Sequence, residues 1–163
     1  MSTATRTLEL YTAIGMAAWL CSYSEYHSDW PLWAFDENIR PPLDLGQYRF
    51  YLSDSGTPVG FASWAWLNDS AKAAVISEEP LEHKQWNSGE NLIFWDFIAP
   101  WGHAKGMVRD LIKNVVGPRE ALSLGRSPDG SIRKIYRWRG GGSVRRTNAD
   151  LLRLITAVPQ LGK

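Results

Sequence analysis

The chain has 163 residues, enough for one domain with a sizeable core, and its 44% hydrophobic and 21% charged residues are typical of a soluble globular protein. It contains one cysteine, Cys21, which excludes an intrachain disulfide framework and favours a small buried hydrophobe in a reducing compartment. The net charge of +1 is unevenly distributed. Residues 1–118 carry 8 Lys/Arg and 14 Asp/Glu, whereas residues 119–163 carry 10 and 3. This basic second part predicts an acidic partner, the alternative being a solvated face without one.

Residues 7–22 are predicted to form a helix, because apolar side chains recur there at helical spacing. The segment is shorter than the ~20 residues of a membrane span. Glu9 interrupts any signal-peptide pattern, so we expect a cytoplasmic protein without stable membrane insertion. Residues 22–35 are expected to be irregular with aromatic anchors, and the Arg-Pro-Pro of residues 40–42 is expected to exclude a regular helix.

The later part of the chain is predicted to contain five strands and two helices. A polar, Ala-rich connection is expected between the second strand and Gly89. The remaining predicted elements are strands 47–53, 57–67 and 91–98, a helix at 103–115, strands 121–126 and 131–139, and a helix at 147–158. This order predicts a mixed α/β (α+β) fold, with a central, mostly antiparallel mixed sheet flanked by helices, in a single domain over residues 1–163.

The strand Asn91–Ile98 carries a carboxylate, Asp96, at its centre. Six of its eight residues are apolar or aromatic, and Pro100 follows, which is typical of a strand covered on both faces. An unpaired charge there would cost several kcal/mol, so Asp96 requires a partner. One possibility is a purely structural ion pair; its candidate partners are Arg40, Arg49 and Arg126.

A histidine is the other possible partner. His83 lies in a charged stretch and should be solvated, and His103 lies at the start of a helix, where it is either exposed or in contact with a bound phosphate. His27 lies in an aromatic segment after the first helix. An imidazole titrates near neutral pH, which suits acid–base chemistry, and Asp96 could orient it. A structural role for His27 is the alternative.

Four stretches together resemble successive blocks of one family. They are SEYHSDWPLWAF, QYRFYLSDSGTPVGFASWAWL, WNSGENLIFWDFIAPWG and SPDGSIRKIYRWRGGG. In this order and spacing they are similar to the toxin-activating lysine acyltransferases, over about residues 8 to 142. The resemblance implies a GNAT-like fold. It also implies an enzyme that moves a fatty acyl group from acyl-acyl carrier protein to internal lysine ε-amines of an RTX protoxin in the bacterial cytoplasm.

The resemblance also implies roles for particular residues. His27 and Asp96 fall on the essential catalytic positions, and Ser24 and Asn38 fall on supporting positions. The acyl carrier protein is a co-substrate with a phosphopantetheine thioester; no bound cofactor and no metal are expected, and a homodimer is implied. His27 would be a general base or a nucleophile, and backbone N–H groups or the Asn38 amide would stabilise the oxyanion.

The donor suggests two further sets of residues. The pantetheine phosphate would lie at the turn into the helix at 103–115, near Gly102, His103 and Gly106. The acidic carrier would dock on basic residues of the second part, namely Arg126, Arg133, Lys134 and Arg137.

Two non-catalytic functions are alternatives to the acyltransferase hypothesis. The Arg/Gly-rich stretch and the aromatic strands could form a nucleic-acid-binding module. The acidic residues 1–118 and the buried Asp96 argue against it, and we expect no nucleic-acid partner. The other hypothesis is a catalytically inactive chaperone of the toxin, for which His27→Ala would have no effect.

Overall fold

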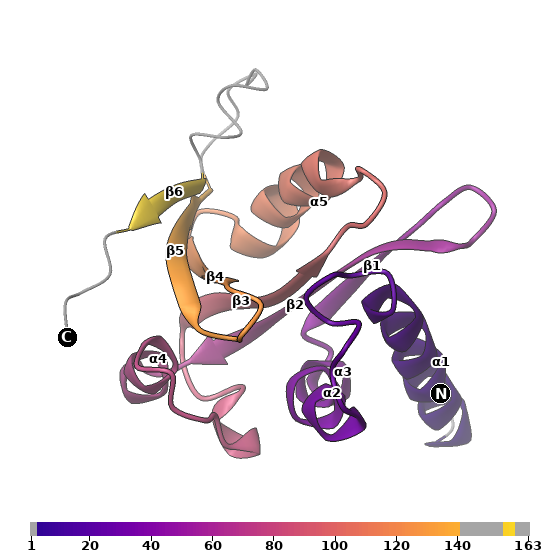
Figure 1. Ribbon diagram of the computed structural model, residues 1–163, viewed down its shortest axis with the longest axis horizontal. Helices are drawn as coiled ribbons and strands as arrows, with labels where there is room; N and C mark the ends of the chain where they lie inside the picture. Colours follow the sequence, from indigo (N-terminus) through magenta and orange to yellow (C-terminus); the bar gives the residue numbers. More distant parts are fainter. Residues whose placement is uncertain (1–2, 141–154, 159–163) are drawn as a thin grey trace. The chain divides into compact units, whose positions relative to one another are not determined.

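The computed structural model describes residues 3–140 and 155–158, and Figure 1 traces their elements along the chain. Contacts divide the chain into two compact units, the first with residues 1–64 and 95–104 and the second with residues 65–94 and 105–163. Two strands, β2 and β3, contribute residues to both units. The prediction of a single domain over 1–163 stays a prediction.

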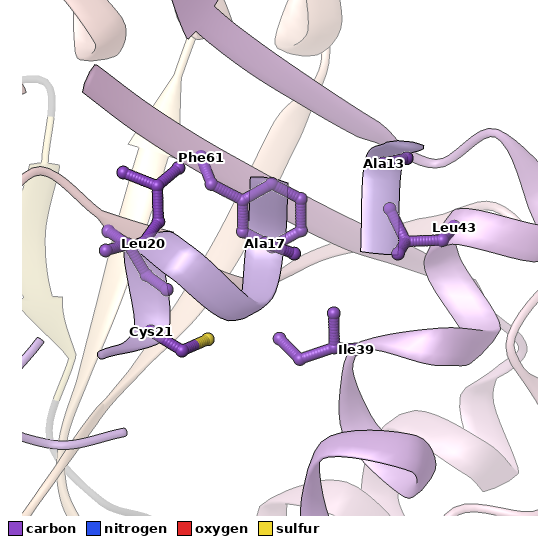
Figure 2. Packing of buried hydrophobic residues seen from close by; sticks show 8 residues of the cluster. Ala13, Ala17, Leu20, Cys21, Ile39, Leu43 and Phe61 are labelled. Carbon is purple, nitrogen blue, oxygen red and sulfur yellow. The ribbon is translucent and has the colours of Figure 1, made fainter. Parts of the chain in front are cut away.

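The first unit is built on a helix and a hairpin. Its elements are α1 (Thr3–Cys21), α2 (Leu32–Asn38), α3 (Arg40–Leu45), β1 (Tyr48–Leu52) and the first part of β2 (Pro58–Leu67). β1 and β2 pair antiparallel, with Phe50 opposite Phe61. The predicted first helix and hairpin are therefore confirmed. Figure 2 shows the core between them, in which Ala17, Leu20 and Cys21 of α1 pack near Ile39 and Phe61.

Helix α3 corrects the expectation that Arg-Pro-Pro excludes a regular helix. Pro41 and Pro42 lie in its first turn and are buried. The N–H groups of a first turn have no acceptor within the helix, so proline loses nothing there and its fixed φ suits the helix. The helix ends at Gly46, whose φ of 68° is in the left-handed region that glycine tolerates.

The second unit contains a helix that the sequence analysis missed. Where a polar connection was expected, Asp69–Ile76 forms α4 and residues His83–Gln85 form a short 3-10 turn. Asn68 caps α4, because its Oδ1 accepts the N–H of Ala71 at 2.8 Å. Ala71 and Val75 are buried on one side of the helix. The short polar stretch thus becomes a helix through its cap and two apolar side chains.

The remaining elements complete the sheet. They are β3 (Asn91–Ile98), α5 (Ala104–Leu111) with a π-helical turn (Ile112–Val116), β4 (Glu120–Arg126), β5 (Ile132–Arg139) and β6 (Ile155–Val158). β3 and β4 run parallel, whereas β4 with β5 and β5 with β6 are antiparallel, and the hydrogen-bonded order is β1-β2-β3-β4-β5-β6. The predicted class, mixed α/β with a mostly antiparallel sheet and helices, is confirmed and is consistent with a GNAT-like fold.

The predicted helix at 147–158 is wrong at its end. Residues 155–158 form strand β6 beside β5, and residues 147–154 lie outside the described residues. The segment Ile-Thr-Ala-Val is rich in β-branched residues, which favour a strand once a neighbouring strand offers its edge. Among the residues that the structure describes, no helix has the length and apolar character to cross a membrane.

Candidate active site

His27 lies in the turns that follow α1 and is 6% exposed. The turns are closed by backbone hydrogen bonds, with the His27 N–H donating to the Ser24 carbonyl at 2.9 Å and the Trp30 N–H donating to the His27 carbonyl at 3.0 Å. The ring centroids of Tyr26 and Trp30 lie 4.8 and 4.6 Å from that of the imidazole. The aromatic residues of this segment therefore hold the His27 ring in a fixed place.

Asp96, on β3, is the partner of this imidazole. It is 5% exposed, and its Oδ1 lies 2.9 Å from His27 Nε2. Both residues belong to the first unit. Of the arginines considered as structural partners, Arg40 pairs with Asp36 and Asp44 instead. A carboxylate oxygen accepts, so His27 Nε2 carries the proton in this bond, and in the neutral imidazole Nδ1 is then the acceptor.

The other ring nitrogen of His27 contacts Ser24. Ser24 Oγ lies 2.7 Å from His27 Nδ1, and the hydroxyl is the donor when Nε2 carries the proton. A hydroxyl, an imidazole and a carboxylate thus form a series within the first unit. The same three groups occur in series in serine hydrolases, where the hydroxyl is the nucleophile and the imidazole takes its proton, although there the hydroxyl contacts Nε2 and the carboxylate contacts Nδ1.

A fourth residue, Ser63 on β2, was missed by the sequence analysis. It is fully buried, and its Oγ donates to Asp96 Oδ2 at 3.3 Å and accepts the Asp96 N–H at 3.2 Å. A signal was present in the sequence. Ser63 places a hydroxyl in an apolar strand, between the buried residues Ala62 and Trp64. In the same way, Asp96 places a carboxylate in an apolar strand.

Asn38, at the end of α2, is held by a different set of contacts. Its Nδ2 donates to the Ala34 carbonyl at 2.8 Å, and its Oδ1 accepts the indole N–H of Trp95 at 3.2 Å. Successive residues of a strand point to opposite faces, so Trp95 and Asp96 leave β3 in different directions. Within the described part of the chain, no hydrogen bond joins Asn38 to His27 or Asp96.

The turn into α5 has the predicted strand–turn–helix form. Gly102 has a φ of 83°, a conformation that favours glycine, and His103 precedes the first helical residue, Ala104. Gly106 lies in the first turn of α5, and Gly102, His103 and Gly106 are all exposed. Contact with a pantetheine phosphate at these residues stays a prediction.

The four residues expected to dock the carrier lie on the β4–β5 hairpin, but they do not share one face. On β5, Arg133 lies two residues before Ile135 and Arg137 lies two residues after it, so the two arginines point to the same face of the strand. Lys134 points to the other face. Lys134 Nζ lies 5.4 Å from the ring centroid of Tyr136. Arg126 donates to the Gly130 carbonyl at 2.8 Å, inside the turn of the hairpin.

Cys21, at the end of α1, is buried as predicted and is 6% exposed. Burial, and secondarily the negative charge of Asp96, raise the pKa of this thiol from 9.0 to about 12. A thiol is a nucleophile only as the thiolate. Cys21 is therefore a packing residue rather than an acyl acceptor. In residues 3–140 and 155–158, no group of three or more His, Cys, Asp or Glu side chains could hold a metal ion.

A buried imidazole between a carboxylate and a hydroxyl, on a GNAT-like sheet, suits an enzyme that transfers a group to a nucleophile it must deprotonate. Comparison with known proteins narrows this class. The family model of the HlyC, or RTX toxin acyltransferase, family matches residues 6–139. The chain belongs to the RTX toxin acyltransferase family and is an acyltransferase enzyme.

Individual relatives agree with this assignment. The chain is 32% identical over 133 residues to the protein-lysine myristoyltransferase RtxC of Kingella kingae, covering 79% of this chain and 78% of the relative. It is 32% identical over 133 residues to the RTX-I toxin-activating lysine-acyltransferase ApxIC of Actinobacillus pleuropneumoniae, covering 80% and 76%. It is 32% identical over 118 residues to the protein-lysine palmitoyltransferase CyaC of Bordetella bronchiseptica, covering 72% and 62%.

Proposed function

We propose that this protein transfers a fatty acyl group from acyl-acyl carrier protein to lysine ε-amines of an RTX protoxin, in the bacterial cytoplasm, and so activates the toxin. The observation that carries the proposal is the series formed by the half-buried Ser24 and the buried His27 and Asp96. The names of the relatives, which include a myristoyl- and a palmitoyltransferase of protein lysines, support the acceptor and the fatty donor.

The acceptor amine sets the chemical problem. A lysine with the usual pKa of about 10.4 is neutral in only about one molecule in 10³ at pH 7, and only the neutral amine attacks a thioester. The ammonium therefore loses one proton to the solvent before the attack, and a base near the bound amine takes a second proton from the nitrogen as the nitrogen bonds to the thioester carbon. In an enzyme this kind of help contributes a factor of about 10²–10⁴ to the rate.

His27 Nδ1 is the base in this proposal. The proton passes from the amine to Nδ1, either through the Ser24 hydroxyl or after the amine has displaced that hydroxyl from Nδ1. Asp96 keeps the Nε2 proton in place and stabilises the imidazolium that forms. The amine nitrogen bonds to the thioester carbon, the carbon–sulfur bond breaks, and the carrier thiolate leaves with a proton from His27.

His27 as nucleophile is the rival route, through an acyl-imidazole on Nδ1. The 2.7 Å contact between Nδ1 and Ser24 Oγ favours the base, because a proton can pass through the Ser24 hydroxyl to Nδ1 while this contact is kept, whereas an attack by Nδ1 on the thioester requires the hydroxyl to leave. The two routes differ in a single-turnover experiment without acceptor. Only the nucleophile route leaves acyl-enzyme, which intact-mass spectrometry detects as an increase by one acyl group.

The carrier and its prosthetic group complete the proposal. Acyl carrier proteins are acidic, and Arg133 and Arg137 give one face of β5 a positive charge that would steer such a partner. The phosphopantetheine phosphate is proposed to bind at the turn of Gly102, His103 and Gly106. Assembly into a homodimer stays a prediction.

The direct test is transfer to the acceptor. The enzyme is mixed with the lysine-bearing domain of the RTX protoxin and either acyl-acyl carrier protein or the matching acyl-coenzyme A, and acylated peptides are located by mass spectrometry. The proposal expects modification of specific lysines from the carrier, and loss of transfer in His27→Ala but not in the exposed His83→Ala. Transfer that is equally fast from coenzyme A would remove the carrier from the proposal, and transfer that persists in His27→Ala would remove the site.

A further inference from the structure

The fully buried Ser63 joins β2 to the carboxylate of Asp96 by two hydrogen bonds. The backbone of Ser63 is fixed, because Ser63 pairs with Tyr48 in the β1–β2 ladder and the next N–H, of Trp64, donates to the Gln47 carbonyl at 3.0 Å. The hydroxyl is fixed as well. Its oxygen accepts the Asp96 N–H, which directs its proton towards Asp96 Oδ2.

The Asp96 side chain needs such a restraint. The torsion that rotates a carboxylate is broad, so the strand alone does not decide where its two oxygens point. With Ser63 holding Oδ2, the other oxygen, Oδ1, is directed to His27 Nε2 at 2.9 Å. The same bond supplies a donor to Oδ2, which accepts no other hydrogen bond from the residues that the structure describes.

We propose that Ser63 is a positioning residue of the acyl transfer: it fixes the rotation of the Asp96 carboxylate, and through Asp96 it fixes the ring and the tautomer of His27. This inference rests on the proposed function of the His27–Asp96 pair. Ser63 contacts neither ring nitrogen of His27 and acts only through Asp96. Removing its hydroxyl leaves the carboxylate free to rotate, so that fewer molecules hold the Nε2 proton when the amine attacks.

The experiment combines steady-state kinetics with nuclear magnetic resonance of the ring nitrogens. Ser63→Ala removes the hydroxyl, and Ser63→Cys replaces it with a weaker donor of similar volume. Ser123→Ala is the matched control, because Ser123 is also a strand serine with a bonded hydroxyl, which accepts the indole N–H of Trp138 at 2.8 Å in the second unit. The exposed His83 and His103 serve as internal references for the His27 signals.

The proposal expects kcat to fall about ten-fold in Ser63→Ala with KM changed less than about two-fold, which is the size of one hydrogen bond to a charged group. The Nε2 proton of His27 should exchange with water several-fold faster than in the wild type. Ser63→Cys should change both quantities in the same direction, and Ser123→Ala should change neither. If Ser63→Ala does not fold, Ser63→Cys decides the question by the same two readouts.

Two results would overturn the proposal. Unchanged kcat would mean that the reaction does not need Ser63, and a lower kcat with an unaltered His27 Nε2 proton would mean that Ser63 acts by another route. Failure of the proposed function is recognised separately, because a wild type without acyl transfer still shows in the resonance measurement whether Ser63 holds Asp96 and His27 in place.

Discussion

The thiol of Cys21 reports on the electrostatics around Asp96. Its pKa of about 12, against an ordinary 9.0, means that at pH 8 the folded protein contains about 10³-fold less thiolate than the unfolded chain. Alkylation by iodoacetamide requires the thiolate. We therefore expect the folded protein to react at least about 10³-fold more slowly at pH 8 than the same protein in concentrated guanidinium, with steric protection adding to the difference.

The variant Asp96→Asn separates the two causes of this shift. Burial is the larger cause and the Asp96 charge the smaller, so the substitution should accelerate labelling while leaving it far below the rate of the unfolded chain. Cys21→Ala should retain kcat within about two-fold, since the thiol takes no part in transfer. Labelling of the folded wild type within ten-fold of the unfolded rate would refute the reasoning, as would an Asp96→Asn variant that labels no faster than the wild type.

The same shift predicts how stability depends on pH. The folded-state pKa of Cys21 is raised, so the folded protein retains this proton at pH values where the unfolded chain loses it. The stabilising contribution of the group is therefore complete below pH 9 and is lost as the pH rises towards 12. Urea unfolding of the wild type and of Cys21→Ala across this alkaline range tests the prediction. The free energy of unfolding should fall more steeply with pH in the wild type, because only the wild type has the thiol.

Three further predictions concern packing, capping and docking. Phe61→Ala, at a fully buried core position, should lower the free energy of unfolding by about 3–5 kcal/mol in urea, whereas Leu32→Ala, which is 87% exposed, should change it by less than about 0.5 kcal/mol. Asn68→Ala should cost about 0.5–2 kcal/mol because α4 loses its cap, and an unchanged unfolding midpoint would contradict that role. Arg133→Glu should raise KM for the acidic carrier at low salt more than Lys134→Glu, since they lie on opposite faces of β5; equal effects would remove this docking face.

The sequence predicted that Asp96 needs a partner, because a carboxylate in an apolar strand is costly without one, but it left that partner open between His27 and an arginine. The family resemblance placed His27 and Asp96 on the essential positions, and the structure shows the contact between them. The sequence did not predict Ser63, although a hydroxyl in the buried β2 is the same kind of signal. Nor could it predict that Ser24 contacts Nδ1 and Asp96 contacts Nε2. That assignment depends on the turns after α1, whose backbone hydrogen bonds have no periodic pattern in the sequence.

In the fold, too, elements with a periodic sequence pattern were predicted, whereas elements that depend on local features were missed. The hairpin of β1 and β2 followed from alternating strands and a turn, and α1 followed from its apolar spacing. Errors arose where one residue decides the outcome. Proline is harmless in the first turn of α3, and the Asn68 cap establishes α4 in a polar stretch. Strand β6 formed where helical spacing was expected, because the edge of β5 offers it hydrogen bonds.

In the proposed reaction, His27 and Asp96 together deprotonate the acceptor lysine. Intact-mass spectrometry of the protoxin domain, incubated with acyl-acyl carrier protein and each enzyme variant, tests it most directly. We predict one or more added acyl groups with the wild type and with the exposed-site control His83→Ala, and a rate about 10²–10⁴-fold lower with His27→Ala and Asp96→Asn. Equal acylation by all four proteins would contradict the account and would leave the 2.9 Å contact between His27 and Asp96 as a structural pair.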